Sequence, residues 1–351
     1  MVRSSTRPGA WLVLALASGC GDEPGRGTPW SMTSAMGSDG SSTGPGSSDG
    51  GPHESSGVAG SSDGSGTGDP TGGSSDSGAI DCTPPPPDPA WLLPQLQDTV
   101  ARLSGAAELG GTLLPDRATV TRRALVAAFL FEQLDALGTE VQTHDYGTGT
   151  NVIARVPATG ASAGTYVVGA HYDSVPGAPG ADDNATGVAV VTALARHLMS
   201  LPCRSHDVLV VAFDEEELGL VGSTAFAAKL VADREPVVAV HTIDQIGYDA
   251  DGDRNLELER PDPGLFEFYA DVADGVPQLG ALVVTDTGFT DHVAFREAGF
   301  VAIGLSEEYV SGDTTPHYHL PSDTYDTVAF GLVETAATLV NHAFATALAG
   351  A

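Results

Sequence analysis

Three features of the 351-residue sequence predict an α/β fold, a three-layer sandwich with a mostly parallel central sheet. Short apolar runs rich in Val and Ile alternate with stretches of helical periodicity, and polar residues follow several of the runs directly. Apolar strands that alternate with amphipathic helices are typical of a parallel sheet covered on both faces. The pattern continues through residues 91–351, which we expect to form one domain.

The expected elements follow one another in a regular order along this domain. Helical spacing of apolar residues runs through 121–137 and stops at Gly138. Strands are expected at 152–156, 166–170, 208–213, 237–243 and 300–305. Further helices are expected at 184–200, 222–232, 263–274 and 329–349.

The first 90 residues have a different composition. Residues 1–20 combine a basic start, a short apolar run and a terminal Cys20, which predicts an export signal of the lipoprotein type. Lipid on Cys20 would tether the protein to a membrane, and plain secretion is the alternative. Residues 21–90 are dominated by Gly, Ser, Asp and Pro and are expected to form a disordered tether.

Two further sequence features concern the environment of the chain. Cys82 and Cys203 either pair in an exported protein or stay unpaired, because spacing alone does not supply the geometry. The formal charge is −31, from 15 Lys and Arg against 46 Asp and Glu. Such a surface repels phosphate backbones, so we expect no nucleic-acid partner.

Candidate metal ligands follow expected strands or lie in loops between elements. They are His171, Asp183, Glu217, Asp244 and His319. Because ligands bind beyond the carboxyl ends of the strands in such sheets, we expect these side chains to converge. Imidazole and carboxylate groups suit zinc, and five of them suit two ions bridged by one carboxylate.

These residues lie in motifs that resemble the two-zinc exopeptidases of clan MH, the family of bacterial leucyl-type aminopeptidases, glutamate carboxypeptidase and glutaminyl cyclase. The matching segments are Gly169 to Ser174, Pro179 to Gly187, Glu216 to Ser223, Ile243-Asp244 and Tyr318 to Asp323. They occur between residues 169 and 323 in the order found in the family. The resemblance implies the fold of a zinc-dependent exopeptidase and a cofactor of two zinc ions.

The resemblance also implies a role for each ligand. One ion would bind His171 and Asp244, and the other would bind Glu217 and His319. Asp183 would bridge the two ions, which leaves its neighbour Asp182 with a structural role.

The same resemblance assigns the catalytic groups. Glu216 would be the general base that acts on a hydroxide-forming water held by both ions, and Glu215 would be an outer acid. Tyr318 would steady the oxyanion, with simple packing beside His319 as the alternative. Asp173 would orient His171. Thr290-Asp291-His292 resembles a Ser-Asp-His segment of the family and would line the pocket or cap a helix.

The expected function is that of an aminopeptidase acting on peptides with a free N-terminus and, preferably, an apolar first residue. Acidic residues near the expected site suit an ammonium group, whereas a carboxypeptidase needs a cation for the terminal carboxylate. A carboxypeptidase, a glutaminyl cyclase and a catalytically inactive surface binding module remain alternatives. The complete ligand set argues against the inactive module.

Overall fold

An eight-stranded sheet forms the centre of the domain in the computed structural model, which describes residues 82–86, 89–310 and 312–349. The strand order is β1-β2-β4-β3-β5-β8-β6-β7. The strands are β1 (Glu140–Asp145), β2 (Thr150–Val156), β3 (Thr165–His171), β4 (Asp207–Phe213), β5 (Val237–Ile243), β6 (Leu256–Glu259), β7 (Leu282–Thr285) and β8 (Ala302–Ser306). The four central strands β4, β3, β5 and β8 are parallel, while β2 and β6 run antiparallel to their central neighbours.

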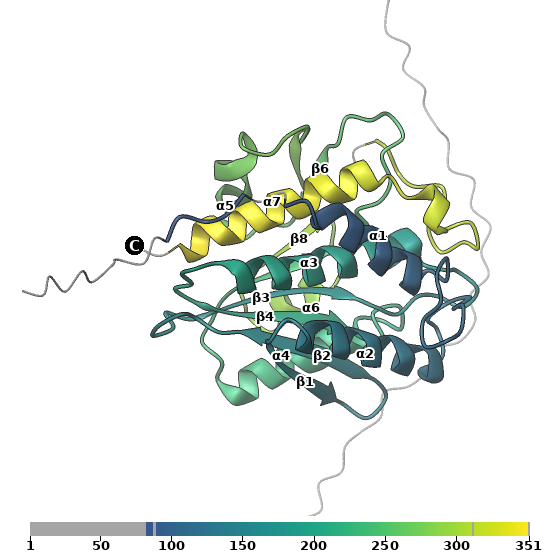
Figure 1. Cartoon of the computed structure of the whole chain (residues 1–351), viewed down its shortest axis with the longest axis horizontal. Helices are drawn as coiled ribbons and strands as arrows, with labels where there is room; N and C mark the ends of the chain where they lie inside the picture. The colour runs from purple at the N-terminus through teal and green to yellow at the C-terminus, as the bar shows by residue number, and fades with distance from the viewer. Residues whose placement is uncertain (1–81, 87–88, 311, 350–351) are drawn as a thin grey trace, which may run out of the picture. The chain divides into compact units, whose positions relative to one another are not determined.

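Helices cover both faces of this sheet, which confirms the predicted three-layer fold. They are α1 (Leu92–Leu103), α2 (Val120–Asp135), α3 (Gly187–Ser200), α4 (Val221–Asp233), α5 (Leu265–Ala273), α6 (His292–Glu297) and α7 (Phe330–Leu348). A π-helical turn η1 (Ala181–Thr186) precedes α3, and a 3-10 turn η2 (Tyr325–Thr327) precedes α7. Figure 1 shows α1, α3 and α7 together on one side of the sheet.

The alternation of side chains along β4 explains the two covering layers. Val208, Val210 and Ala212 pack in the larger core cluster, with residues of α1, α2, α3 and α7. The intervening residues of the strand pack in a second cluster that contains Phe226 of α4 and Phe295 of α6. Successive side chains of a strand point to opposite faces, so an apolar strand such as β4 requires cover on both.

All the elements expected from the sequence are present, with ends shifted by at most three residues. The largest shift is at α3, which begins at Gly187 because η1 occupies the residues before it. Elements that the sequence did not predict are α1, α6, β1, β6 and β7. Three of these are strands at or near the sheet edges, so they add to the sheet without changing its centre.

Helix α1 begins at Leu92, and the domain boundary expected at residue 91 stays a prediction. The expected export signal at 1–20, the lipid-bearing Cys20 and most of the tether expected at 21–90 lie outside the described residues. None of the helices within the described ranges is both long and apolar enough to cross a membrane.

A disulfide joins Cys82 to Cys203, which settles the question that their spacing left open. The two Cα atoms are 5.2 Å apart, within the usual range for a disulfide. The bond ties the segment before α1 to the loop after α3, across 121 residues of sequence. The cross-link therefore closes a long loop and restricts the unfolded chain strongly.

Replacing both cysteines by alanine should lower the free energy of unfolding by about 2–4 kcal/mol, the usual effect of a cross-link over a long loop. Denaturant unfolding with and without a reducing agent measures the difference. The wild type should become less stable on reduction, whereas the double variant should not respond. Equal stability of the oxidised wild type and the double variant would contradict this expectation.

Candidate functional site

The register of three parallel strands brings the candidate ligands to one edge of the sheet. His171, the last residue of β3, pairs with Phe213, the last residue of β4. On the other side of β3, Gly169 pairs with Thr242, so that β5 ends at a matching level. The residues that follow β4 and β5, including Asp244, therefore lie beside His171 at the carboxyl edge.

A first group of donor atoms surrounds the Nε2 atom of His171. This atom lies 3.3 Å from Asp183 Oδ1 and 3.3 Å from Asp244 Oδ1. All three side chains are buried. One imidazole nitrogen and two carboxylate oxygens this close together form a ligand set for a divalent metal ion.

A second group shares one of these carboxylates. His319 Nε2 lies 3.3 Å from Asp183 Oδ2 and 2.9 Å from Glu217 Oε2. The two oxygens of Asp183 therefore face different imidazole rings, while Asp244 and Glu217 each belong to one group only. A shared carboxylate between two ligand groups is the arrangement expected of a two-metal centre.

Unsatisfied polar atoms show that the residues present fit such ions. Both ring nitrogens of His171, Asp244 Oδ1 and Glu217 Oε1 are buried and have no hydrogen-bond partner among the described residues. Buried polar atoms are costly when they lack partners, and coordination of a metal supplies one. The mixture of imidazole and carboxylate donors suits zinc.

The pKa shifts of the acids in the site also indicate that it suits cations. Burial raises the pKa of Glu216 to about 10, and the nearby carboxylates add to the effect while His171 opposes it. Burial likewise raises the pKa of Glu217 to about 7 and that of Asp244 to about 6. For Asp183, burial is outweighed by the close contacts with His171 and His319, which lower the pKa. Cations in this site would offset the crowded negative charge and favour the ionised carboxylates.

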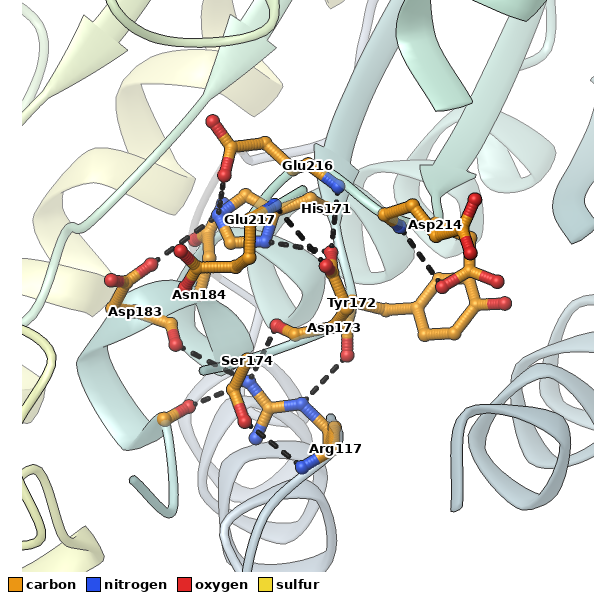
Figure 2. Close-up of polar contacts among 12 residues, drawn as sticks. Arg117, His171, Tyr172, Asp173, Ser174, Asp183, Asn184, Asp214, Glu216 and Glu217 are labelled. Carbon is orange, nitrogen blue, oxygen red and sulfur yellow. Dashed lines mark hydrogen bonds and ion pairs between the residues drawn. The ribbon is translucent and has the colours of Figure 1, made fainter. Parts of the chain in front are cut away.

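The turn after β4 allows two adjacent glutamates to face the same site. Glu215 has a φ of 59°, in the left-handed region, so the chain turns sharply before Glu216 and Glu217. The carboxylate of Asp173 accepts hydrogen bonds from the backbone N–H groups of Glu216, at 3.0 Å, and Glu217, at 3.2 Å. Asp173 Oδ1 also lies 3.4 Å from His171 Nδ1, so this one residue positions three members of the site (Figure 2).

The remaining acids of this turn are held away from the two ligand groups. Arg123 contacts Asp214 Oδ1 through Nε at 2.7 Å and Glu215 Oε1 through Nη2 at 2.8 Å. Thr148 donates a further hydrogen bond to Glu215. Glu215 is therefore engaged in a buried ion pair, in keeping with the outer position expected for it.

The turn before α3 separates the roles of its two aspartates. The carboxylate of Asp323 accepts hydrogen bonds from the backbone N–H groups of Asp182, at 2.8 Å, and Asp183, at 3.1 Å. The Asp182 side chain lies beside Thr186, whereas that of Asp183 lies between the two imidazole rings. Asp323 is thus a positioning residue that the sequence motif contained without indicating its contacts.

Arg117 is a second positioning residue, and sequence reasoning missed it. Its guanidinium is fully buried and donates hydrogen bonds to the carbonyls of Tyr172, Pro179 and Gly180, at 2.6 to 2.9 Å (Figure 2). These carbonyls belong to the loop between His171 and Asp183, so Arg117 fixes that loop at both ends. Its partners lie 55 to 63 residues away in sequence, and no local pattern signals such contacts.

A cavity of about 330 Å³ opens beside the two ligand groups. Asp183, Glu216, Asp244 and His319 line it, together with Tyr318. The ring of Tyr318 stacks on that of His319, with 3.7 Å between the ring centroids. The remaining lining residues are Gln245, Glu259, Thr287, Phe289, Thr290, Ser306 and Tyr309.

The roles expected for the segment Thr290-Asp291-His292 were lining of the pocket and capping of a helix. Thr290 lines the cavity, while Asp291 occupies the N-cap position of α6 without a capping hydrogen bond from its side chain. His292 is fully buried behind Thr290. Only the first residue of the segment therefore reaches the pocket wall.

Comparison with known proteins agrees with this geometry. The curated relatives include the aminopeptidase YwaD of Bacillus subtilis, 32% identical over 184 residues, which cover 50% of this chain and 39% of the relative. They also include the probable lipoprotein aminopeptidase LpqL of Mycobacterium tuberculosis, 31% identical over 205 residues, which cover 50% of this chain and 41% of the relative. The chain thus spans about two fifths of the length of either relative.

The fold also matches that of solved structures. BSAP, a zinc aminopeptidase from Bacillus subtilis, superposes with a TM-score of 0.66 at 17% identity, over 74% of this chain and 95% of that structure. At that identity the likeness concerns the fold alone. The sequence profile of peptidase family M28 matches residues 151–344, more than half of the chain and all of the ligand-bearing segments. The chain belongs to peptidase family M28.

Proposed function

We propose that this protein is a zinc-dependent aminopeptidase that removes N-terminal residues from peptides. The observation that carries the proposal is the pair of imidazole–carboxylate groups that share Asp183 beside an acidic cavity. When bound, zinc supplies Lewis-acid chemistry for a peptide carbonyl and lowers the pKa of water. Relatives whose names identify them as aminopeptidases support the same activity.

Each proposed ion is held by three side chains. His171 and Asp244 hold one ion, Glu217 and His319 hold the other, and Asp183 bridges them. This division follows the two groups of short contacts, each of which contains one oxygen of Asp183. It leaves Glu216, whose Oε2 lies 3.9 Å from His171 Nε2, outside both groups.

Glu216 is the proposed general base. Its carboxylate lines the cavity, where it takes a proton from the attacking water and returns a proton to the leaving amine. The hydrogen bond from its backbone N–H to Asp173 fixes its position relative to His171. The high pKa that burial gives this carboxyl falls when cations occupy the neighbouring carboxylates, so that it becomes able to accept the proton.

Tyr318 is the proposed donor to the carbonyl oxygen that gains negative charge during attack. Its ring lines the cavity and stacks on His319, which places the phenol beside one ligand group. Burial and the neighbouring acids raise the pKa of Tyr318 above its ordinary value. The phenol therefore stays protonated at neutral pH and can donate a hydrogen bond.

The charge of the cavity favours a peptide N-terminus over a C-terminus. Among the described residues that line it, four are acidic and none is Lys or Arg. The described lining residues offer no Lys or Arg side chain to pair with a terminal carboxylate, which a carboxypeptidase must bind. The lining therefore supports an aminopeptidase rather than a carboxypeptidase.

We also propose that the protein acts outside the cytoplasm. The disulfide between Cys82 and Cys203 is typical of an oxidising compartment. The basic and apolar start of the sequence supports export, and the name of the relative LpqL supports lipid attachment, for which Cys20 is our candidate.

Glutamine substitutions at the three glutamates after β4 distinguish the proposed general base from the proposed metal ligand. Glu216→Gln should keep its metal and lose about 10³-fold or more in kcat, because the group that transfers protons is removed. Glu217→Gln should lose metal, as measured by elemental analysis. Glu215→Gln is the matched control and should keep both metal and rate. An inactive, metal-loaded Glu215→Gln beside an active Glu216→Gln would contradict the assignment.

One peptide prepared in three forms tests the substrate class. The zinc-loaded protein should release the first residue from the free and the C-amidated forms and leave the N-acetylated form intact. Mass spectrometry of the products measures the release. Cleavage of the acetylated form together with loss of cleavage on amidation would contradict the aminopeptidase proposal in favour of a carboxypeptidase.

A further inference from the structure

The floor of the cavity carries a carboxylate that has no part in the two ligand groups. Glu259 is the last residue of β6, lines the cavity and is 1% exposed. Gly304 of β8 pairs with it across the sheet, and a Cβ atom at Gly304 would collide with Glu259 Oε2. The glycine thus provides the space that this side chain occupies.

The partners of the Glu259 carboxylate within the cavity wall are a threonine hydroxyl and a histidine ring. Thr290 donates to Glu259 Oε2 at 2.7 Å, and Thr290 Oγ1 lies 2.8 Å from His292 Nδ1. The Thr290 hydroxyl has one hydrogen, which it donates to Glu259, so it accepts a hydrogen bond from His292. His292 Nδ1 is therefore the donor in that contact. His292 Nδ1 also lies 3.3 Å from Glu259 Oε2.

His292 approaches Glu259 through one ring nitrogen, Nδ1, and its ring is fully buried. Ser306 Oγ lies 3.4 Å from the other oxygen of the Glu259 carboxylate. Among the described residues, no Lys or Arg side chain forms an ion pair with Glu259.

The walls of the cavity suit a long cationic side chain. Phe289, Tyr309 and Tyr318 present aromatic rings, and Thr287 and Thr290 add hydroxyl groups. Aromatic faces pack against methylene groups and attract a nearby cation. An apolar side chain would leave the buried carboxylate of Glu259 without a counter-charge. This lining disfavours the apolar first residue expected from the sequence.

We propose that Glu259 selects peptides whose N-terminal residue is lysine or arginine, by pairing with the cation of that side chain. The proposal rests on the proposed aminopeptidase function, in which the first residue of the peptide enters this cavity. The cavity volume of about 330 Å³ accommodates one residue of this size.

Lysyl and norleucyl p-nitroanilides test the selection, because norleucine has the methylene chain of lysine without its ammonium. The wild type should have a kcat/KM for the lysyl substrate about 30-fold or more above that for the norleucyl substrate. Glu259→Gln should lose most of this ratio, mainly through a lower kcat/KM for the lysyl substrate. Glu257→Gln removes a charge from the same strand outside the cavity and should keep the ratio.

Two kinetic results would overturn the proposal. One is a wild type that does not prefer lysine to norleucine. The other is a Glu259→Gln variant that loses both activities equally, which would assign Glu259 to the α-ammonium group or to the fold.

Isothermal titration calorimetry with free lysine and free norleucine measures binding without hydrolysis. Failure of the proposed function and failure of the pocket assignment can therefore be told apart. Failure of the wild type to hydrolyse either anilide would count against the aminopeptidase proposal alone. Tighter binding of lysine than of norleucine, lost in Glu259→Gln, would still support the pocket assignment. Equal binding of the two amino acids by the wild type would overturn it.

Discussion

The carboxylate of Asp183, shared between two imidazole rings, is the interaction on which the rest of the site depends. Each of its oxygens lies 3.3 Å from a different histidine, while Asp244 completes the group around His171 and Glu217 the group around His319. So many buried acids destabilise one another unless cations separate them. Burial is the main cause of the raised pKa of Glu217 and of Asp244, and the neighbouring carboxylates add to it. The fold must therefore hold these acids in place against their mutual repulsion.

Backbone contacts rather than packing meet this demand. Asp173 and Asp323 accept hydrogen bonds from the N–H groups of the two turns that carry the acids. Arg117 binds carbonyls of the loop between His171 and Asp183. Glu215 takes a left-handed conformation that turns the chain as β4 ends. Asp183 and Glu217, two of the candidate ligands, are thus fixed through their own main chains. The same turns form the border of the cavity where the proposed substrate binds.

The sequence predicted the parts of this structure that depend on local pattern. Apolar runs such as 208–213 are buried strands, and the motifs around His171 and Asp183 bring the ligands together as expected. The edge strand β7 and its neighbour β6 were missed because runs of four residues are too short for a periodic signal. Arg117 and Glu259 were missed because their partners lie tens of residues away and only the fold brings them together.

Elemental analysis of the purified protein tests the two-metal centre most directly. The shared position of Asp183 predicts two zinc equivalents for each chain, and Asp183→Asn should reduce the content at both positions together. Such joint loss is expected only if one carboxylate bridges the two ions. A fully active protein that holds a single equivalent or none, or an Asp183→Asn variant that keeps both, would contradict the account.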